Sequence, residues 1–423
     1  MLDRKTQPSF NPLRKVSIPK ITTSTLDNGT RLSYLNHEST NVFKLELVIK
    51  AGSWYASDYH LVPLTLRMLN EGTVKRSGKS IAEEFDKLGS FIELTPGFDN
   101  SSLVIYGLTK FFESNLNLIE EVFFHPSFDE VAFTNLKKRE AQKLELNLEK
   151  SSYKASTLHR KNIFGTTHPY GAISNPKTLK SITVDQIREF YGNQFGSFDI
   201  LISGNLPDNF QNSIDNLFNI RSNDSLSSAL AITHTLTNLS EPKIEERNSK
   251  FIQSSIRLGK TIFNRNHVDY IDFMVLNEVL GGYFGSRLMR NIREDKGYTY
   301  GIYSQLYALN HAGYFTIGTD VDADNESKTI DEIHLEIERL RNDQIPEEEL
   351  LTVKNYMSGT FAGSLGTPFS LMDKYKAVFY QGLDMSFFDA YVERINAVNS
   401  LRLQSLANEY LSEESFSLAV VGR

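Results

Sequence analysis

Two hydrophobic patterns alternate along this chain. Some short segments alternate apolar with polar residues or form a brief apolar run, which predicts strands, and longer segments have apolar residues at helical spacing. In the first half the predicted strands are residues 42–50, 91–94, 102–108 and 198–204. The predicted helices of this half are residues 58–70, 80–88, 110–124, 128–150, 154–164 and 183–191. Ser80, followed by Glu83, predicts a capping box at the start of the second of these helices.

The same order of elements returns in the second half. Its predicted strands are residues 251–259, 298–306, 313–321 and 415–422, and its predicted helices are residues 270–294, 325–342 and one that begins at Pro346. Residues 415–422 echo residues 197–204, because both are apolar runs that end in glycine and follow a helix ending in tyrosine. An internal duplication of about 200 residues is the simplest account of this repeat.

A change of composition separates the two halves. Residues 205–245 are rich in Asn, Ser, Asp and Thr, and their later part is interpreted as a linker. The predicted domains are therefore residues 1–222 and 246–423, joined by a linker over residues 223–245.

Composition excludes several classes of function. None of the 423 residues is a cysteine, which excludes disulfides, thiol nucleophiles and Cys-based zinc sites. The net charge of −7 argues against nucleic acid as a partner. No apolar run is long enough to span a membrane, and the first residues have no signal-peptide core. A cytoplasmic location is expected, or a periplasmic one if a signal peptide is missing from this sequence.

The stretch with the most chemical content is residues 281–300. Lys296 and Gly297 provide a cation and a glycine suited to end the preceding helix, and an alternating strand pattern follows. Arg293 is thereby placed on the last helical turn and Tyr300 near the start of the strand. This geometry allows a guanidinium and a phenol to point at one spot. The glycines do not form a phosphate-binding loop, because they lack its spacing.

The motifs of this stretch resemble those of a known family. Residues 282–288 (GYFGSRL), 292–294 (IRE) and 296–300 (KGYTY) resemble the C-terminal domain signature of the pitrilysin/insulinase family of zinc metallopeptidases. Further motifs follow the family's order, at residues 51–53 (AGS), 70–73 (NEGT), 88–89 (LG), 168–171 (HPYG) and 181–183 (SIT). The resemblance implies an α+β fold of two homologous domains, each an antiparallel sheet with helices packed on it. It also implies that Arg293 and Tyr300 contact the substrate backbone and the oxyanion.

The family's zinc motif is missing. Active members carry His-x-x-Glu-His on the helix before the Gly-Thr pair, and this sequence has Pro63, Leu66 and Arg67 at the three positions. Proline and leucine offer no ligand atom, and arginine remains a cation. No two histidines stand three or four residues apart; the nine are His37, His60, His125, His159, His168, His234, His267, His311 and His334. No metal site is expected in this chain.

A glutamate at the position of the family's last zinc ligand could still be present. The family's last zinc ligand is a glutamate on a later helix, here the one that holds Glu140, Glu145 and Glu149. Without the histidines, these three are interpreted as solvated charges among the lysines and arginines of the same helix.

The Arg/Tyr pair also has a structural interpretation. Arg293 could pair with Glu294 or Asp295 at the helix end, and Tyr300 could pack in the core. Other side chains of the same stretch compete for the proposed roles: Arg287, Arg290, Tyr298 and Tyr303.

The resemblance leads to a prediction of function. Some pitrilysin-like enzymes divide the active site between a zinc subunit and a homologous subunit that closes the chamber and lends Arg and Tyr. The chain is predicted to be such a non-zinc subunit, donating Arg293 and Tyr300 to a peptide or an unfolded segment, with zinc in a His-x-x-Glu-His partner. The strand at residues 102–108 is expected to hold the substrate by strand addition. The alternatives are a structural subunit, like the core subunits of a respiratory complex in the same superfamily, and a peptide-binding homodimer.

Overall fold

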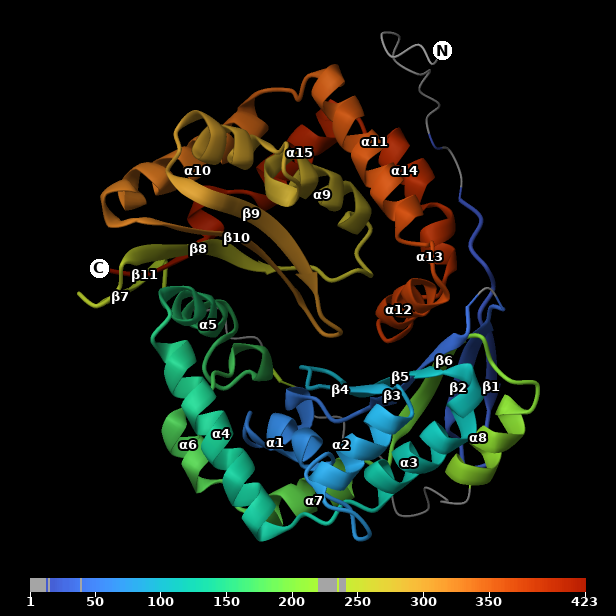
Figure 1. Cartoon of the computed structure of the whole chain (residues 1–423). Coiled ribbons are helices and arrows are strands. Elements are labelled where there is room, and N and C mark those ends of the chain that lie inside the picture. The colour runs from blue at the N-terminus through green and yellow to red at the C-terminus, as the bar shows by residue number, and fades with distance from the viewer. Residues whose placement is uncertain (1–12, 14–15, 39, 220–233, 236–240) are drawn as a thin grey trace, which may run out of the picture.

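The computed structural model describes residues 13, 16–38, 40–219, 234–235 and 241–423. Its strands form two sheets with the orders β1-β2-β6-β3-β5-β4 and β7-β11-β8-β10-β9 (Figure 1). The strands of the first sheet are β1 (Thr22–Thr25), β2 (Arg31–Asn36), β3 (Val42–Ile49), β4 (Phe91–Thr95), β5 (Ser101–Leu108) and β6 (Phe198–Gly204). Those of the second are β7 (Lys243–Arg247), β8 (Gln253–Ile262), β9 (Thr299–Ala308), β10 (Gly313–Asp322) and β11 (Ser417–Gly422).

The helices fall into two corresponding sets. Those that precede β7 are α1 (Leu61–Met68), α2 (Gly78–Lys87), α3 (Phe112–Phe124), α4 (Glu130–Leu148), α5 (Ser151–Phe164), α6 (Pro176–Ser181), α7 (Val184–Gln194) and α8 (Phe210–Phe218). Those that follow β8 are α9 (Tyr270–Asn277), α10 (Glu326–Asn342), α11 (Glu347–Gly363), α12 (Pro368–Phe379), α13 (Ser386–Asp389), α14 (Tyr391–Ala397) and α15 (Ser400–Tyr410). Two wider π-helical turns, η4 (Glu278–Gly282) and η5 (Met289–Asp295), follow α9.

The two sheets share one topology, which confirms the predicted duplication. Apart from the extra strand β1, the order β2-β6-β3-β5-β4 corresponds strand for strand to β7-β11-β8-β10-β9. Both sheets are antiparallel except for one pair each, because β2 runs parallel to β6 and β7 runs parallel to β11. The predicted α+β fold is confirmed, with sheets that are mixed and not purely antiparallel.

Each sheet is covered on both faces. The helices α1, α3 and α7 cover one face of the first sheet, and α9, α10 and α15 cover one face of the second (Figure 1). Burial on both sides accounts for β6, in which every residue is buried. It also accounts for β3, where Phe43 and Leu45 face their own helices while Lys44 and Glu46 are buried on the opposite face.

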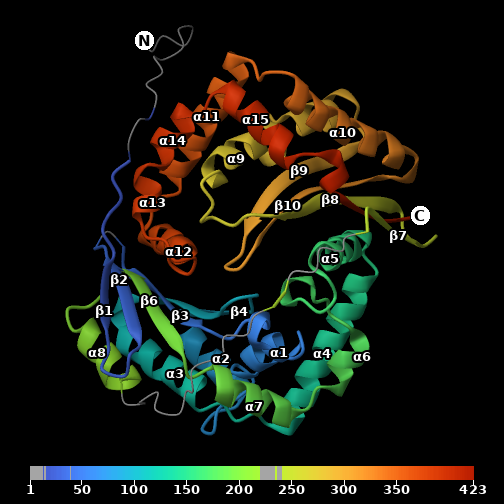
Figure 2. The same cartoon turned by 180° about the vertical axis from the view of Figure 1, so that it is seen from behind.

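The opposite face of each sheet is covered by a helix from the other half. α5 packs on β8 and β11, and α12 packs on β6 and β2, as Figures 1 and 2 show from opposite sides. Leu371, Met372 and Tyr375 of α12 join a hydrophobic cluster with residues of the first sheet. On α5, Ala155 packs against Val421 of β11. The two helices also occupy the same position in the order of elements, so the exchange is reciprocal.

Charged groups reinforce the contact of α12. Glu46 pairs with Lys376 of α12 and lies 3.6 Å from Lys44, which itself pairs with Asp373 of α12. Burial would raise the pKa of Glu46, but Lys376 and Lys44 hold it below its usual value. Because Lys44 and Glu46 are buried, each depends on its partners to remain ionised.

A third contact joins the halves at the tip of the β9–β10 hairpin. The ring of His311 stacks on that of Trp54, with 3.8 Å between ring centroids. Asn310 donates its backbone N–H to Asp99, 3.0 Å away, and Asp99 also accepts from Tyr170. Tyr170 belongs to the 168–171 motif, so this motif supports the contact between the halves.

Several predicted boundaries are corrected. The capping box expected at Ser80 is wrong, because Ser77 caps α2 and accepts the Ser80 N–H at 3.3 Å. The helix predicted over residues 270–294 is interrupted at Tyr283, whose backbone is extended, and it continues as wider turns on either side. Gly281, just before the break, allows close packing on β9, because a Cβ there would meet Ser304 at 2.6 Å. The predicted stop is confirmed: Gly297 has the left-handed φ of 64°.

The predicted linker lies mostly outside the described residues. Within it, Nε2 of His234 lies 2.9 Å from the carbonyl oxygen of Trp54, and Lys243 begins β7. The domain boundaries at residues 222 and 246 remain predictions. No helix in the described part of the chain has the length and apolarity needed to cross a membrane.

Candidate substrate-contact site

Arg293 and Tyr300 line the same cavity. Its volume is about 650 Å³, and it lies where η5 passes into β9. The other residues that line it are Gln253, Glu294, Gly297, Tyr298, Thr299, Asp320 and Asp322. The structure thus brings the two predicted site residues to one place, and their chemical role remains a prediction.

A β-bulge presents the tyrosine. Thr299 pairs with Val321 and Ile302 pairs with Thr319, so two residues of β9, Tyr300 and Gly301, stand opposite the single Asp320 of β10. Such bulges often redirect a side chain beside a functional site. Here Tyr300 is 94% exposed. The interpretation of Tyr300 as a packed core residue is therefore wrong.

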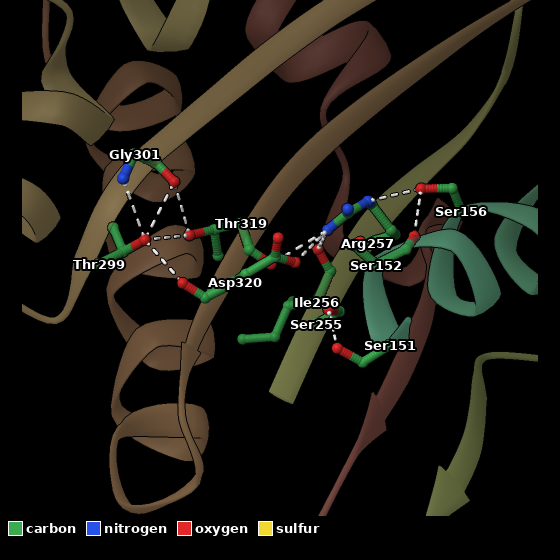
Figure 3. Close-up of polar contacts among 10 residues, drawn as sticks. All are labelled: Ser151, Ser152, Ser156, Ser255, Ile256, Arg257, Thr299, Gly301, Thr319 and Asp320. Atoms are coloured by element: carbon green, nitrogen blue, oxygen red, sulfur yellow. Dashed lines mark hydrogen bonds and ion pairs between the residues drawn. The ribbon is translucent and has the colours of Figure 1, made fainter. Parts of the chain in front are cut away.

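Hydrogen bonds fix both neighbours of Tyr300 (Figure 3). The Thr299 hydroxyl lies 2.8 Å from the carbonyl oxygen of Asp320 and accepts the Gly301 N–H at 3.2 Å. The Thr319 hydroxyl donates to the Thr299 hydroxyl oxygen at 2.9 Å. Because the residues on either side are held, the backbone position of Tyr300 is fixed by these hydrogen bonds.

This network continues into the first half of the molecule. Buried Arg257 of β8 donates to the carbonyl oxygen of Thr319 at 3.0 Å and to Asp320 at 3.3 Å (Figure 3). Its Nε donates to the hydroxyl of Ser156 on α5 at 3.0 Å. The guanidinium of Arg257 therefore connects the bulge to α5, the helix that the first half contributes to this sheet.

Arg293 lies on η5 with its guanidinium over a ring. Its Cζ is 4.5 Å from the centroid of Phe284, whose side chain is 61% exposed. No ion pair between Arg293 and Glu294 or Asp295 occurs among the residues that the structure describes. A guanidinium over an aromatic face keeps its N–H donors available in the plane.

Three of the four competing residues have other contacts. Arg287 forms a two-bonded ion pair with Glu349, with both distances 2.9 Å. The ammonium group of Lys328 lies over the ring of Tyr298 at 5.9 Å. Tyr303 is 41% exposed and packs over Gly318. Neither Arg287, Arg290 nor Tyr303 lines the cavity, whereas Tyr298 does.

The positions of the missing zinc motif lie on α1. Pro63 occupies the first turn, where proline is tolerated, and Leu66 is fully buried. Arg67 forms an ion pair with Glu140 of α4, with side-chain exposures of 29% and 20%. The interpretation of Glu140 as a solvated charge is therefore wrong. A guanidinium now serves as the counter-charge of the carboxylate.

A cavity of about 190 Å³ lies beside the positions of the missing zinc motif. Arg67, Glu140 and His60 line it. His60 is buried, which lowers its pKa, and its Nε2 accepts the Asn175 N–H at 3.1 Å. No group of three or more metal-ligating side chains occurs within the described ranges. The donor set does not fit zinc, because proline and an arginine cation stand at the two histidine positions and leucine replaces the catalytic glutamate.

The strand expected to bind substrate is not free. β5, which contains residues 102–108, pairs with β3 on one side and β4 on the other. The expectation of strand addition at residues 102–108 is therefore wrong. The strands at the two edges of this sheet are β1 and, next to β5, β4. Phe91 at its start is 63% exposed, and Pro96 just beyond its end lines the cavity that contains Arg67.

Two protein-family models match this chain. The model described as Insulinase (Peptidase family M16) matches residues 32–169, and the model described as Peptidase M16 inactive domain matches residues 181–357. The chain belongs to peptidase family M16. The resemblance seen in the sequence motifs is confirmed, and the later part of the chain is of the inactive-domain type.

Relatives of the M16 chain span nearly its full length. The "Uncharacterized zinc protease YmxG" of Bacillus subtilis is 25% identical over 407 residues, covering 94% of this chain and 97% of that protein. The "Non-peptidase homolog YmxG" of Helicobacter pylori is 20% identical over 419 residues, covering 93% and 95%.

Solved structures share the M16 fold. A "peptidase M16 inactive domain" from Pseudomonas fluorescens has a TM-score of 0.84 at 24% identity, covering 96% of this chain and 98% of that one. The "periplasmic protease PqqL" of Escherichia coli has a TM-score of 0.78 at 15% identity, covering 98% of this chain and 47% of that one. At these identities the likeness shows the fold alone.

Sequence reasoning missed two features of this M16 site. The bulge depends on how β9 meets β10, which the sequence of β9 alone does not contain. The Arg67–Glu140 pair joins residues that are 73 positions apart. The sequence did contain a sign of this pair, since Arg67 stands at a zinc-ligand position while Glu140 remains on the helix that carries the family's last ligand.

Proposed function

We propose that this chain is the non-zinc subunit of a two-chain M16 peptidase, closing the chamber and donating Arg293 and Tyr300 to the substrate. The observation that carries the proposal is the shared cavity, lined by an exposed phenol and by a guanidinium without an acidic partner in the described part of the chain. A homologous His-x-x-Glu-His subunit would supply the zinc. The cytoplasmic location also remains a prediction; PqqL, a structural neighbour, is described as periplasmic.

In this proposal the chain contributes electrostatic stabilisation of the transition state. When water attacks a peptide carbonyl, negative charge develops on its oxygen, and fixed donors aimed at that oxygen stabilise the transition state. Tyr300 would provide an O–H donor and Arg293 N–H donors. The hydrogen bonds around Thr299 hold the backbone beside Tyr300, so little reorganisation is required. Loss of one such donor typically lowers the rate about 100- to 1000-fold.

The free edge of β4 would hold an extended peptide. Strand addition uses backbone hydrogen bonds, which accept any sequence, so it suits peptides and unfolded segments. The cavity that contains Arg67 lies beside the end of β4 and carries no zinc motif. Cleavage would take place at the partner's zinc and not at this site.

The test is peptide cleavage by reconstituted mixtures. The protein should be inactive alone and active when mixed with a zinc-bearing M16 homologue from the same organism. Arg293→Ala and Tyr300→Phe should each lower kcat of the mixture without preventing its assembly. Arg290→Ala and Tyr303→Phe are matched controls on the same helix and strand. Cleavage by the protein alone, or equal effects of test and control variants, would refute the proposal.

A non-catalytic role is the second candidate. It is favoured by the relative named "Non-peptidase homolog YmxG", which aligns over nearly the whole chain. The protein would then be a structural subunit or a peptide-binding homodimer. A stable complex that stays inactive in every mixture would support this role over the first.

A further inference from the structure

A third cavity lies between helices of the second half. It has a volume of about 380 Å³ and is lined by residues of α9, α11, α12, α13 and α14, together with the loop before α9. We call it the α12 pocket. In Figure 1 these helices, other than α9, form the orange and red group beside β6. Its volume falls within the range of small-molecule sites, about 300–1000 Å³.

The walls of the α12 pocket are aromatic. Phe361 and Phe388 are buried, with stacked rings 5.7 Å apart, and Tyr391 lies 4.6 Å from Phe361. Tyr270 and Phe387 complete the lining of rings. Such walls favour an apolar group and offer few hydrogen bonds to it.

Two cations enter this aromatic pocket. The Lys374 ammonium lies over the rings of Phe361 at 5.1 Å and Phe388 at 5.5 Å. The Arg265 guanidinium lies over Tyr270 at 5.6 Å and Phe387 at 5.9 Å, and one of its nitrogens donates to the carbonyl oxygen of Ala377. Ring faces stabilise a cation but leave most of its N–H donors available.

Neither cation has an acidic partner among the residues that the structure describes. Asp373 also lines the pocket, but its carboxylate pairs with Lys44. Burial lowers the pKa of Lys374, and the nearby charge of Arg265 lowers it further. Two like charges in a half-buried apolar site are unfavourable unless an anion offsets them.

We propose that the α12 pocket binds a carboxylate attached to an apolar body, with Arg265 and Lys374 holding the carboxylate and the rings enclosing the body. A single carboxylate matches the two cations, since each of its oxygens can accept from one of them. A free phosphate fits less well, because its further oxygens would face aromatic rings without donors. Two sources share this chemistry: a small aromatic or aliphatic acid, and the C-terminus of a peptide that ends in an apolar residue.

The first experiment is calorimetric titration of the full chain with N-acetylphenylalanine and with its neutral amide. The proposal expects the acid to bind at least about tenfold more tightly than the amide, because the amide loses the charge-assisted hydrogen bonds. Equal affinities, or no binding of the acid at millimolar concentration, would overturn it. This comparison uses the unaltered protein and so does not depend on variant folding.

A second arm distinguishes the sources. A hexapeptide ending in phenylalanine is compared as the free acid and as the C-terminal amide. Tighter binding of the peptide acid than of N-acetylphenylalanine assigns the pocket to chain termini, and the reverse order assigns it to small acids.

Variants then locate the site. Lys374→Gln and Arg265→Gln should each weaken binding of the acid by about tenfold or more, because each removes one charged donor. Lys79→Gln, which makes the same change at an exposed residue of α2, is the matched control and should leave binding unchanged. Circular dichroism checks that the variants are folded. An unchanged affinity in both pocket variants would place the ligand elsewhere and refute the proposal.

Discussion

The hydroxyl oxygens of Thr299 and Thr319 lie 2.9 Å apart, on the two strands that form the bulge beneath Tyr300. Valine at position 299 keeps the shape but removes the acceptor of the Gly301 N–H and the donor to Asp320. We expect Thr299→Val to destabilise the fold by about 1–3 kcal/mol, the usual cost of leaving such groups unsatisfied. Amide hydrogen exchange should accelerate at Gly301. Thr352→Val, at an exposed threonine of α11, should alter neither quantity.

The Arg67–Glu140 pair predicts how a metal site can be restored. The triple variant Pro63→His, Leu66→Glu, Arg67→His rebuilds the family's motif on α1, and Glu140 becomes free to act as the last ligand. We expect this variant to bind one zinc ion, measured by competition with a chromophoric chelator. Adding Glu140→Gln should weaken zinc binding about tenfold or more. Equal affinity in the triple and quadruple variants would show that Glu140 is not aimed at the site.

Substitution of Glu46 is expected to lower the free energy of unfolding strongly. It is 2% exposed and pairs with Lys376, close to buried Lys44. Glu46→Gln leaves these cations without that carboxylate, and removal of one member of a buried pair costs on the order of 3–5 kcal/mol. Asp373→Asn, at a side chain that is 55% exposed, should cost less. Urea denaturation measures both variants. If the two losses are equal, the buried cluster is not the main link between α12 and the first sheet.

The buried His159 of α5 is expected to make the folded protein less stable in acid. Burial against the second sheet lowers its pKa from 6.5 to about 4. Between these values the unfolded chain binds the proton and the folded chain does not, so stability is full above pH 6.5 and declines as the pH falls toward 4. The contribution lost at pH 5 is on the order of 2 kcal/mol. His159→Gln should therefore lose less stability than the natural protein between pH 7.5 and pH 5. A parallel decline in both would contradict this assignment.

Much of the fold follows from local sequence signals. The alternation in β3, the left-handed Gly297 and the Pro346 helix start depend on a few neighbouring residues, and the sequence predicts all three. The repeat of elements also predicts the shared sheet topology, because each sheet is assembled from strands in the same order.

The features that were not predicted depend on distant partners. The alternation of β3 does not reveal that α12 covers Lys44 and Glu46, since alternating strands usually expose their polar face to water. The bulge at Tyr300 requires β10, and the close approach of Gly281 to Ser304 requires β9. The candidate site was located by motif, but its geometry could not be predicted from that motif.

The exchange of α5 and α12 suggests how such a chain arose. Two copies of one half, each lending a helix to the sheet of the other, form a domain-swapped dimer. Joining the two copies through residues between α8 and β7 would convert that dimer into a single gene product without altering either exchanged contact. After fusion the copies could diverge, so that one kept the Arg/Tyr motif while the other lost its metal ligands.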